Sequence, residues 1–150
     1  MSLALVVAEN ASFPRLGWLA EIDFQESTCW VEHGAFVDVD PAESPRWVAA
    51  CIWGGPFEAG GFLDSASLFG SGLRVMGDEV HFVTSRTTMD RLFYLRTGAR
   101  VVVSNSLVLI LARLGARLDP SADHRRWAEG SCLGVHEYHR DVPIEHASHE

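Results

Sequence analysis

Two pairs of short alternating segments, each joined by a glycine-containing turn, constrain this chain more than any other feature. Residues 73–76 and 80–84 flank Gly77-Asp78, and residues 91–95 and 100–104 flank a Thr-Gly turn. Glycine adopts a positive φ at no steric cost and therefore suits the tight turn of a hairpin. Successive strands joined by tight turns predict an antiparallel sheet.

The first half of the chain is also typical of strands. Residues 3–8 form an apolar run that fits a strand buried on both faces. Residues 18–24 alternate in polarity, and residues 36–40 repeat the alternation over a shorter length. Residues 44–53 begin with a Ser-Pro pair, which is typical of the start of a helix. Both a short helix and a core strand fit this segment.

The period of the pattern changes in the last third. Ser106 is placed to cap a helix that runs to Leu114 with apolar spacing i, i+3, i+4, i+7 and stops at Gly115. A second short helix is predicted over residues 121–130, and residues 135–150 read as a polar, irregular tail. With no repeat or internal linker, we expect residues 1–150 to form a single domain.

Composition excludes several classes of protein. The net charge is −8 and the chain has no lysine, which argues against a nucleic-acid partner. The odd number of widely spaced cysteines, Cys29, Cys51 and Cys132, argues against disulfides and thiolate zinc sites. No apolar run approaches the roughly 20 residues that a membrane span needs. We therefore expect a cytoplasmic protein without a cofactor.

A family resemblance enters with the second hairpin. Residues 84–95 carry a polar segment and an aromatic strand, and residues 101–107 carry an apolar strand that ends in Ser-Asn-Ser before a helix. This order, over residues 63–143, resembles the later part of the glutaminase-like N-terminal domain of asparagine synthetase relatives, the class II glutamine amidotransferases. The resemblance implies an α+β fold of N-terminal-nucleophile hydrolase type: two stacked antiparallel sheets flanked by helices, an αββα sandwich.

The departures from that family concern its chemistry. Active members have a cysteine nucleophile directly after the initiator Met, where this chain has Ser2. The Arg-Gly-Pro-Asp type of segment is missing, and so is the Asn-Gly pair of the oxyanion hole, because Asn10 and Asn105 precede Ala and Ser. The resemblance thus implies a catalytically silent domain, as in β-lactam synthetase and lasso-peptide cyclase.

Such a domain serves as a scaffold or docking partner for an ATP-dependent amide-forming domain or protein. The Ser-Gly-Gly-x-Asp-Ser pyrophosphate loop of that partner does not occur in this chain, and Gly70-Ser71-Gly72 is only an echo of it. Whether the chain is a detached first domain or a stand-alone protein stays open, as does a homodimer.

Two other functions remain as alternatives. Ser2, once freed by removal of Met1, would make the chain a hydrolase or amidotransferase, although an ordinary serine at the start of a strand is the simpler interpretation. In the polar segment Arg86 and Asp90, with Asn105 further on, are candidate substrate-binding residues, and a structural ion pair or turn is the favoured role for that segment.

The third hypothesis is a histidine-rich metal-binding module. Imidazole is a good ligand for zinc or nickel, but glutamates alternate with these histidines, so a solvated tail is the simpler account. The candidate ligands are His136, His139, His146 and His149. We further expect the tryptophans to be core or interface residues; they are Trp18, Trp30, Trp47 and Trp53.

Overall fold

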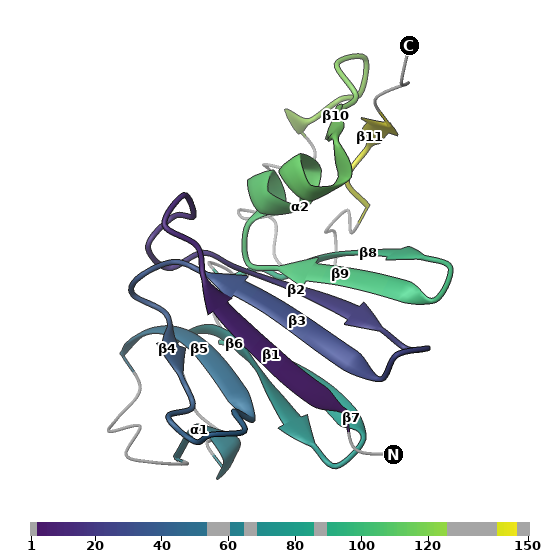
Figure 1. Cartoon of the computed structure of the whole chain (residues 1–150). Helices are drawn as coiled ribbons and strands as arrows, with labels where there is room; N and C mark the ends of the chain where they lie inside the picture. The colour runs from purple at the N-terminus through teal and green to yellow at the C-terminus, as the bar shows by residue number, and fades with distance from the viewer. Residues whose placement is uncertain (1–2, 54–60, 65–68, 86–89, 126–140, 147–150) are drawn as a thin grey trace. The chain divides into compact units, whose positions relative to one another are not determined.

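The computed structural model describes residues 3–53, 61–64, 69–85, 90–125 and 141–146, and the chain divides into two compact units, residues 1–110 and 111–150 (Figure 1). The strands of the first unit are β1 (Ala4–Glu9), β2 (Trp18–Asp23), β3 (Thr28–His33), β4 (Asp38–Val39), β5 (Trp47–Trp53), β6 (Phe69–Met76), β7 (Glu79–Thr84), β8 (Phe93–Thr97) and β9 (Arg100–Ser104). The single turn α1 (Gly61–Asp64) lies in this unit, and the boundary between the units falls within α2 (Leu107–Leu114).

The strands of the first unit form two sheets. One is five-stranded with the order β1-β3-β2-β9-β8, and the other is four-stranded with the order β4-β5-β6-β7. The β6-β7 and β8-β9 hairpins confirm the predicted pairs, and the turn glycines Gly77 and Gly98 have φ values of 70° and 60°. The five-stranded sheet is mixed, because β1 pairs with β3 in parallel.

The main core lies between these two sheets. Alternate residues of β2 and β3 point inward and meet the inward-facing residues of β5 and β6. Trp18 of β2 stacks on Phe82 of β7 with ring centroids 6.2 Å apart. The buried members of this cluster are Leu5, Trp18, Ala20, Ile22, Cys29, Val31, Val37, Val48, Ala50, Leu73, Val75 and Val103.

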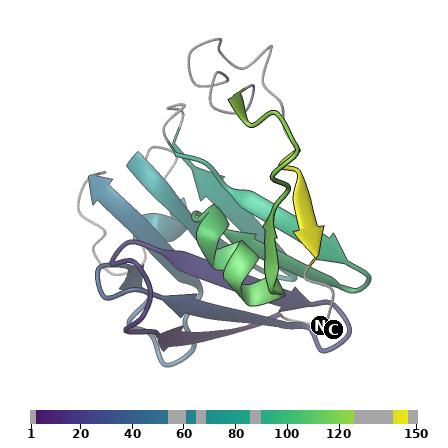
Figure 2. The same ribbon diagram turned by 90° about the horizontal axis from the view of Figure 1, so that it is seen from above.

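The outer faces of the sheets carry smaller apolar contacts. Phe62 of α1 packs on Trp47, with ring centroids 5.6 Å apart, beside the outer face of the four-stranded sheet. Leu19 alternates with the inward-facing Trp18 and Ala20 in β2 and is also buried, and α2 begins at Leu107, soon after β9 of the same sheet (Figure 2). Buried Leu109, in the first turn of α2, lies close to Gly17.

The second unit contains a two-stranded antiparallel sheet. Strand β10 (Ala116–Leu118) pairs with β11 (Ile144–His146), and Arg117 and Glu145 form an ion pair of 3.0 Å across the two strands. Part of the segment expected to be an irregular tail is therefore a strand. The second predicted helix lies mostly outside the described residues. In the described part of the chain, no helix is long and apolar enough to cross a membrane.

The expected fold class is wrong. The described chain is mostly β, with three antiparallel or mixed sheets and only one short helix, α2, besides the single turn α1; it is not an αββα sandwich flanked by helical layers. The physical reason is visible on the outer face of the five-stranded sheet, where Thr28, Glu32, Glu21 and Asp23 tolerate water and need no helical cover.

Several local predictions can be compared with these elements. Helix α2 confirms the predicted helix with Ser106 before it and Gly115, at a φ of 59°, after it. Residues 44–53 resolve into the strand β5, because residues 47–53 pair with β6. The prediction that residues 3–8 are buried on both faces is wrong, since β1 is an edge strand with its even-numbered side chains exposed.

We predict that Gly72→Ala destabilises the first unit. A Cβ at this position would lie 2.5 Å from the Val48 carbonyl oxygen and 2.8 Å from the Phe62 ring, so backbone would have to move. Overpacking of this kind costs about 1–3 kcal/mol, measured as a lower free energy of unfolding in urea. Val108→Ala on exposed α2 is the control and should change it by less than about 0.5 kcal/mol. Equal stability of the two variants would contradict the prediction.

Candidate functional site

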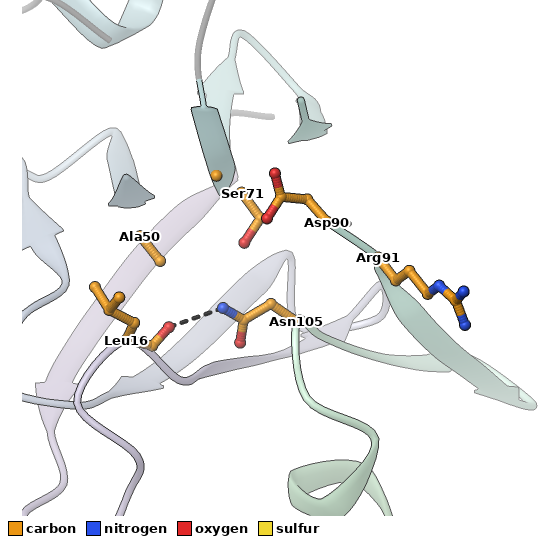
Figure 3. Close-up of a pocket in the computed structure, with 7 residues that line it drawn as sticks. Leu16, Ala50, Ser71, Asp90, Arg91 and Asn105 are labelled. Carbon is orange, nitrogen blue, oxygen red and sulfur yellow. Dashed lines mark hydrogen bonds between the residues drawn. The ribbon is translucent and has the colours of Figure 1, made fainter. Parts of the chain in front are cut away.

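A polar pocket lies at one end of the first unit, where the start of β6 and the end of β9 come together (Figure 3). Its volume is about 130 Å³. The residues that line it come from β5 and β6 of the four-stranded sheet and from the segments that flank β2, β8 and β9: Leu16, Ala50, Gly70, Ser71, Asp90, Arg91 and Asn105.

Asn105 joins the segment after β9 to the start of β2. Its side-chain amide donates a hydrogen bond of 2.8 Å to the Leu16 carbonyl, and its Oδ1 accepts one of 3.0 Å from the Trp18 backbone N–H. Both the donor and the acceptor of the amide are therefore used to hold backbone. The neighbouring Ser104 hydroxyl donates to the Trp18 carbonyl at 2.5 Å and accepts from the Ser106 N–H. The Ser-Asn-Ser motif is a structural clamp.

Ser71 links the two sheets at the floor of the pocket. The buried Trp18 indole Nε1–H donates a hydrogen bond of 3.1 Å to Ser71 Oγ. A buried indole N–H needs such a partner, because an unpaired one would lose the hydrogen bond it makes with water. Ser71 thus completes the core packing of a tryptophan on the opposite sheet.

Asp90 and Arg91 occupy the rim. The Ser85 hydroxyl donates to Asp90 Oδ2, and the Thr84 hydroxyl donates to the Asp90 carbonyl at 3.0 Å. In Figure 3 the Asp90 carboxylate turns toward Ser71, while the Arg91 side chain extends away from the pocket. These bonds tie Asp90 to Thr84, the last residue of β7, and to Ser85, which follows it.

The structure brings two of the sequence-predicted residues together, Asp90 and Asn105, which line the same pocket. Other candidates, Ser2 and Arg86, lie outside the described residues. The same holds for His136, His139 and His149, and His146 is described only as the backbone of β11, opposite Ala116. In the described ranges, no three His, Cys, Asp or Glu side chains form a group that could hold a metal ion.

Sequence analysis predicted Trp18 as a core or interface residue but missed its hydrogen bond to Ser71. From the sequence, Gly70-Ser71-Gly72 was compared only with a pyrophosphate-binding loop, which it superficially resembles. The structure places these residues inside strand β6. Of the other tryptophans, Trp47 is in the core and Trp30 is 57% exposed, which is a surface position. A serine inside an apolar strand, where it would need a buried partner, was the available signal.

Cys29 is the one cysteine whose side chain the structure describes. It lies in the core between the sheets, and this burial raises the pKa of its thiol to about 12. A thiol in that state is not a nucleophile at neutral pH.

Comparison with known proteins gives no assignment: no protein-family model, no curated protein and no solved structure matches this chain.

We predict that Asn105→Ala lowers the free energy of unfolding by about 2–4 kcal/mol, because it removes two hydrogen bonds and leaves a backbone donor and acceptor without them. Urea denaturation followed by tryptophan fluorescence measures this. The matched control is Asn10→Ala after β1, where the amide bonds Glu32 and Oδ1 accepts from exposed Ser12; because water can replace the exposed bonds, the expected loss is below about 1 kcal/mol. If both variants lose the same amount, Asn105 is not a clamp.

We predict that Cys29 resists alkylation by iodoacetamide at pH 8 in the folded protein and reacts fully in urea, as read by peptide mass spectrometry. The raised pKa of Cys29 also makes the stability of the fold depend on pH. An unfolded thiol ionises near pH 8.5, so the stabilisation from burying Cys29 in its neutral form is complete below about pH 8 and falls as pH rises toward 12. Rapid labelling of Cys29 in the native state would contradict its burial.

Proposed function

We propose that this chain is a catalytically silent, asparagine-synthetase-like domain that acts as a scaffold or docking partner for an ATP-dependent amide-forming domain or protein. The observation that carries the proposal is the pocket, whose amide and hydroxyl groups bond to the chain's own backbone and side chains. The resemblance of residues 63–143 to that family supplies the class of partner.

The size and the chemistry of the pocket support the proposal that the domain has no catalytic activity. Its volume of about 130 Å³ is well below the roughly 300–1,000 Å³ of small-molecule sites. An activated nucleophile needs a hydroxyl or thiol within reach of a base. The Ser71 hydroxyl accepts a hydrogen bond from the buried Trp18 indole N–H, which gives it a structural role in the core.

The position of Gly70-Ser71-Gly72 inside β6 supports the proposal that a partner, and not this chain, binds ATP. A pyrophosphate-binding loop presents free backbone N–H groups to the anion. Here Gly70 and Ser71 are buried strand residues paired with β5 and β7. With a net charge of −8, the chain is also poorly suited to attract a polyphosphate, so the partner would bring the nucleotide site.

Exposed aromatic side chains support docking. Phe36 follows β3, Phe69 begins β6 and Tyr94 lies near the start of β8, so strand direction places all three toward the pocket end of the sheets. Tyr94 is 75% exposed, and the Arg15 guanidinium lies 5.0 Å from the centre of the Phe36 ring. Aromatic residues and arginine are the side chains that most often carry binding energy in protein interfaces.

The silent part of the proposal predicts no ammonia release when the purified chain is incubated with L-glutamine, with an active asparagine synthetase as positive control. A coupled glutamate dehydrogenase assay gives the readout. Ammonia release that Ser2→Ala abolishes would establish the hydrolase alternative and overturn the proposal. Ammonia release that survives Ser2→Ala is a contaminating activity and leaves the chain silent.

The docking part predicts that the chain co-purifies in a fixed ratio with the ATP-dependent amide-forming protein of its own source when the two are co-expressed. We expect Tyr94→Ala combined with Phe36→Ala to weaken the complex at least about tenfold in isothermal titration. Val108→Ala, an equally exposed apolar truncation at a residue that does not line the pocket, should leave the affinity unchanged. A ligase that neither binds the chain nor changes its activity on adding it would contradict docking.

A further inference from the structure

The edges of the two larger sheets differ in how they are protected. Unpaired strand edges attract other strands, and proteins blunt them with charge, proline, bulges or shortness. Among the described strands, edge strand β4 has only two residues, β7 carries the exposed Glu79–His81 pair, and β8 carries Arg96. Strand β1, in contrast, has six residues and no charge before Glu9 (Figure 1).

The backbone of β1 shows which of its groups face outward. The Ala4 N–H donates to the Ser27 carbonyl and the Asn10 N–H donates to the His33 carbonyl, both on the β3 side. Since N–H groups alternate along a strand, those of Ala4, Val6, Ala8 and Asn10 point to β3. The amides of Leu5, Val7 and Glu9 therefore point away from the sheet, where no described strand pairs with them.

An apolar patch adjoins this edge on the outer face of the sheet. Val6 is opposite Trp30 in the β1–β3 register, and the two side chains are 37% and 57% exposed. Ala4 and Ala8 flank Val6 on the same face and are exposed as well. An extended row of free amides next to exposed valine and tryptophan is a surface suited to strand addition.

Charge decides which occupant fits. Each copy carries a net charge of −8, so two copies repel except where charge is absent, and β1 offers such a strip from Leu3 to Ala8. A basic peptide would be drawn to the acidic side chains instead. A neutral apolar strand is best matched by a neutral apolar strand, and β1 of a second copy supplies one.

We infer that β1 pairs with β1 of a second copy, antiparallel about a two-fold axis at Val6, which joins the two five-stranded sheets. In this register Val6 faces Val6 of the second copy on the outer side, and Leu5 faces Val7 on the core side. Leu3 faces Glu9, so no carboxylate meets another. The outward amides of Leu5, Val7 and Glu9 can all form hydrogen bonds to the second strand. The core face and the outer face of one sheet continue into the same faces of the other.

The contact is small, and its two-fold symmetry limits the assembly to two copies. Strand pairing together with the Val6 and Trp30 patch covers less than the roughly 1,200–2,000 Å² of a stable interface, so the dimer forms only as concentration rises. Because the contact is isologous, it ends at two copies. This inference does not rest on the proposed function, since β1 takes no part in the pocket.

Sedimentation velocity over a range from about 5 to 500 µM tests the inference. We expect the weight-average mass to rise from 16.5 kDa toward twice that value and no further. Val6→Lys puts two ammonium groups together at the axis and should lower the association constant at least about tenfold. The control, Val108→Lys on exposed α2, makes the same change in net charge and should not lower it. A monomer at all concentrations, larger assemblies, or equal effects of both variants would overturn the inference.

Hydrogen exchange on the wild-type chain tests the location without any variant. The amides of Leu5, Val7 and Glu9 should exchange more slowly at high concentration than at low. The amides of β8 at the opposite edge serve as the internal control and should not change. Protection that appears elsewhere, with β1 unchanged, would show that the dimer uses another surface and would refute the pairing.

Discussion

The first unit depends on how its two sheets are held together at Trp18. The indole is fully buried, stacks on Phe82 and donates its N–H to Ser71 on the opposite sheet. The backbone of the same residue is bonded on both sides by Asn105 and Ser104. Trp18 therefore joins both sheets and the segment that leads into α2. Because its indole N–H is buried, that N–H needs the hydrogen bond to Ser71.

This arrangement supports the proposal that the domain is catalytically silent. The groups that would hold a substrate at this end of the sheets, the Asn105 amide and the Ser71 hydroxyl, are used to satisfy buried backbone and indole groups. The Ser71 hydroxyl accepts a structural hydrogen bond from the buried Trp18 indole in a pocket of only about 130 Å³. The same end of the unit instead exposes aromatic side chains such as Tyr94, a surface suited to another protein.

Sequence analysis predicted features that depend on residues close together in the chain and missed those that depend on distant residues. Both hairpins and α2 were predicted, because glycine turns, alternation and a capping serine act within a few residues. The flanking helical layers were predicted from a resemblance and are absent from the described chain, where polar side chains such as Glu21 and Glu32 occupy part of the outer face of β2 and β3. Of the pocket, Asn105 and Asp90 were proposed in advance, but Ser71 was not, since its partner lies 53 residues away.

The sequence by itself determined the local elements, the two hairpins and α2, since glycine turns, alternation and capping act over short spacings. Only the tertiary structure decided that residues 3–8 form an exposed edge, that β1 runs parallel to β3, and that residues 47–53 are a strand. The reason is that strand order and burial depend on pairing between distant segments. The same apolar run is a central strand or an edge according to which neighbours reach it.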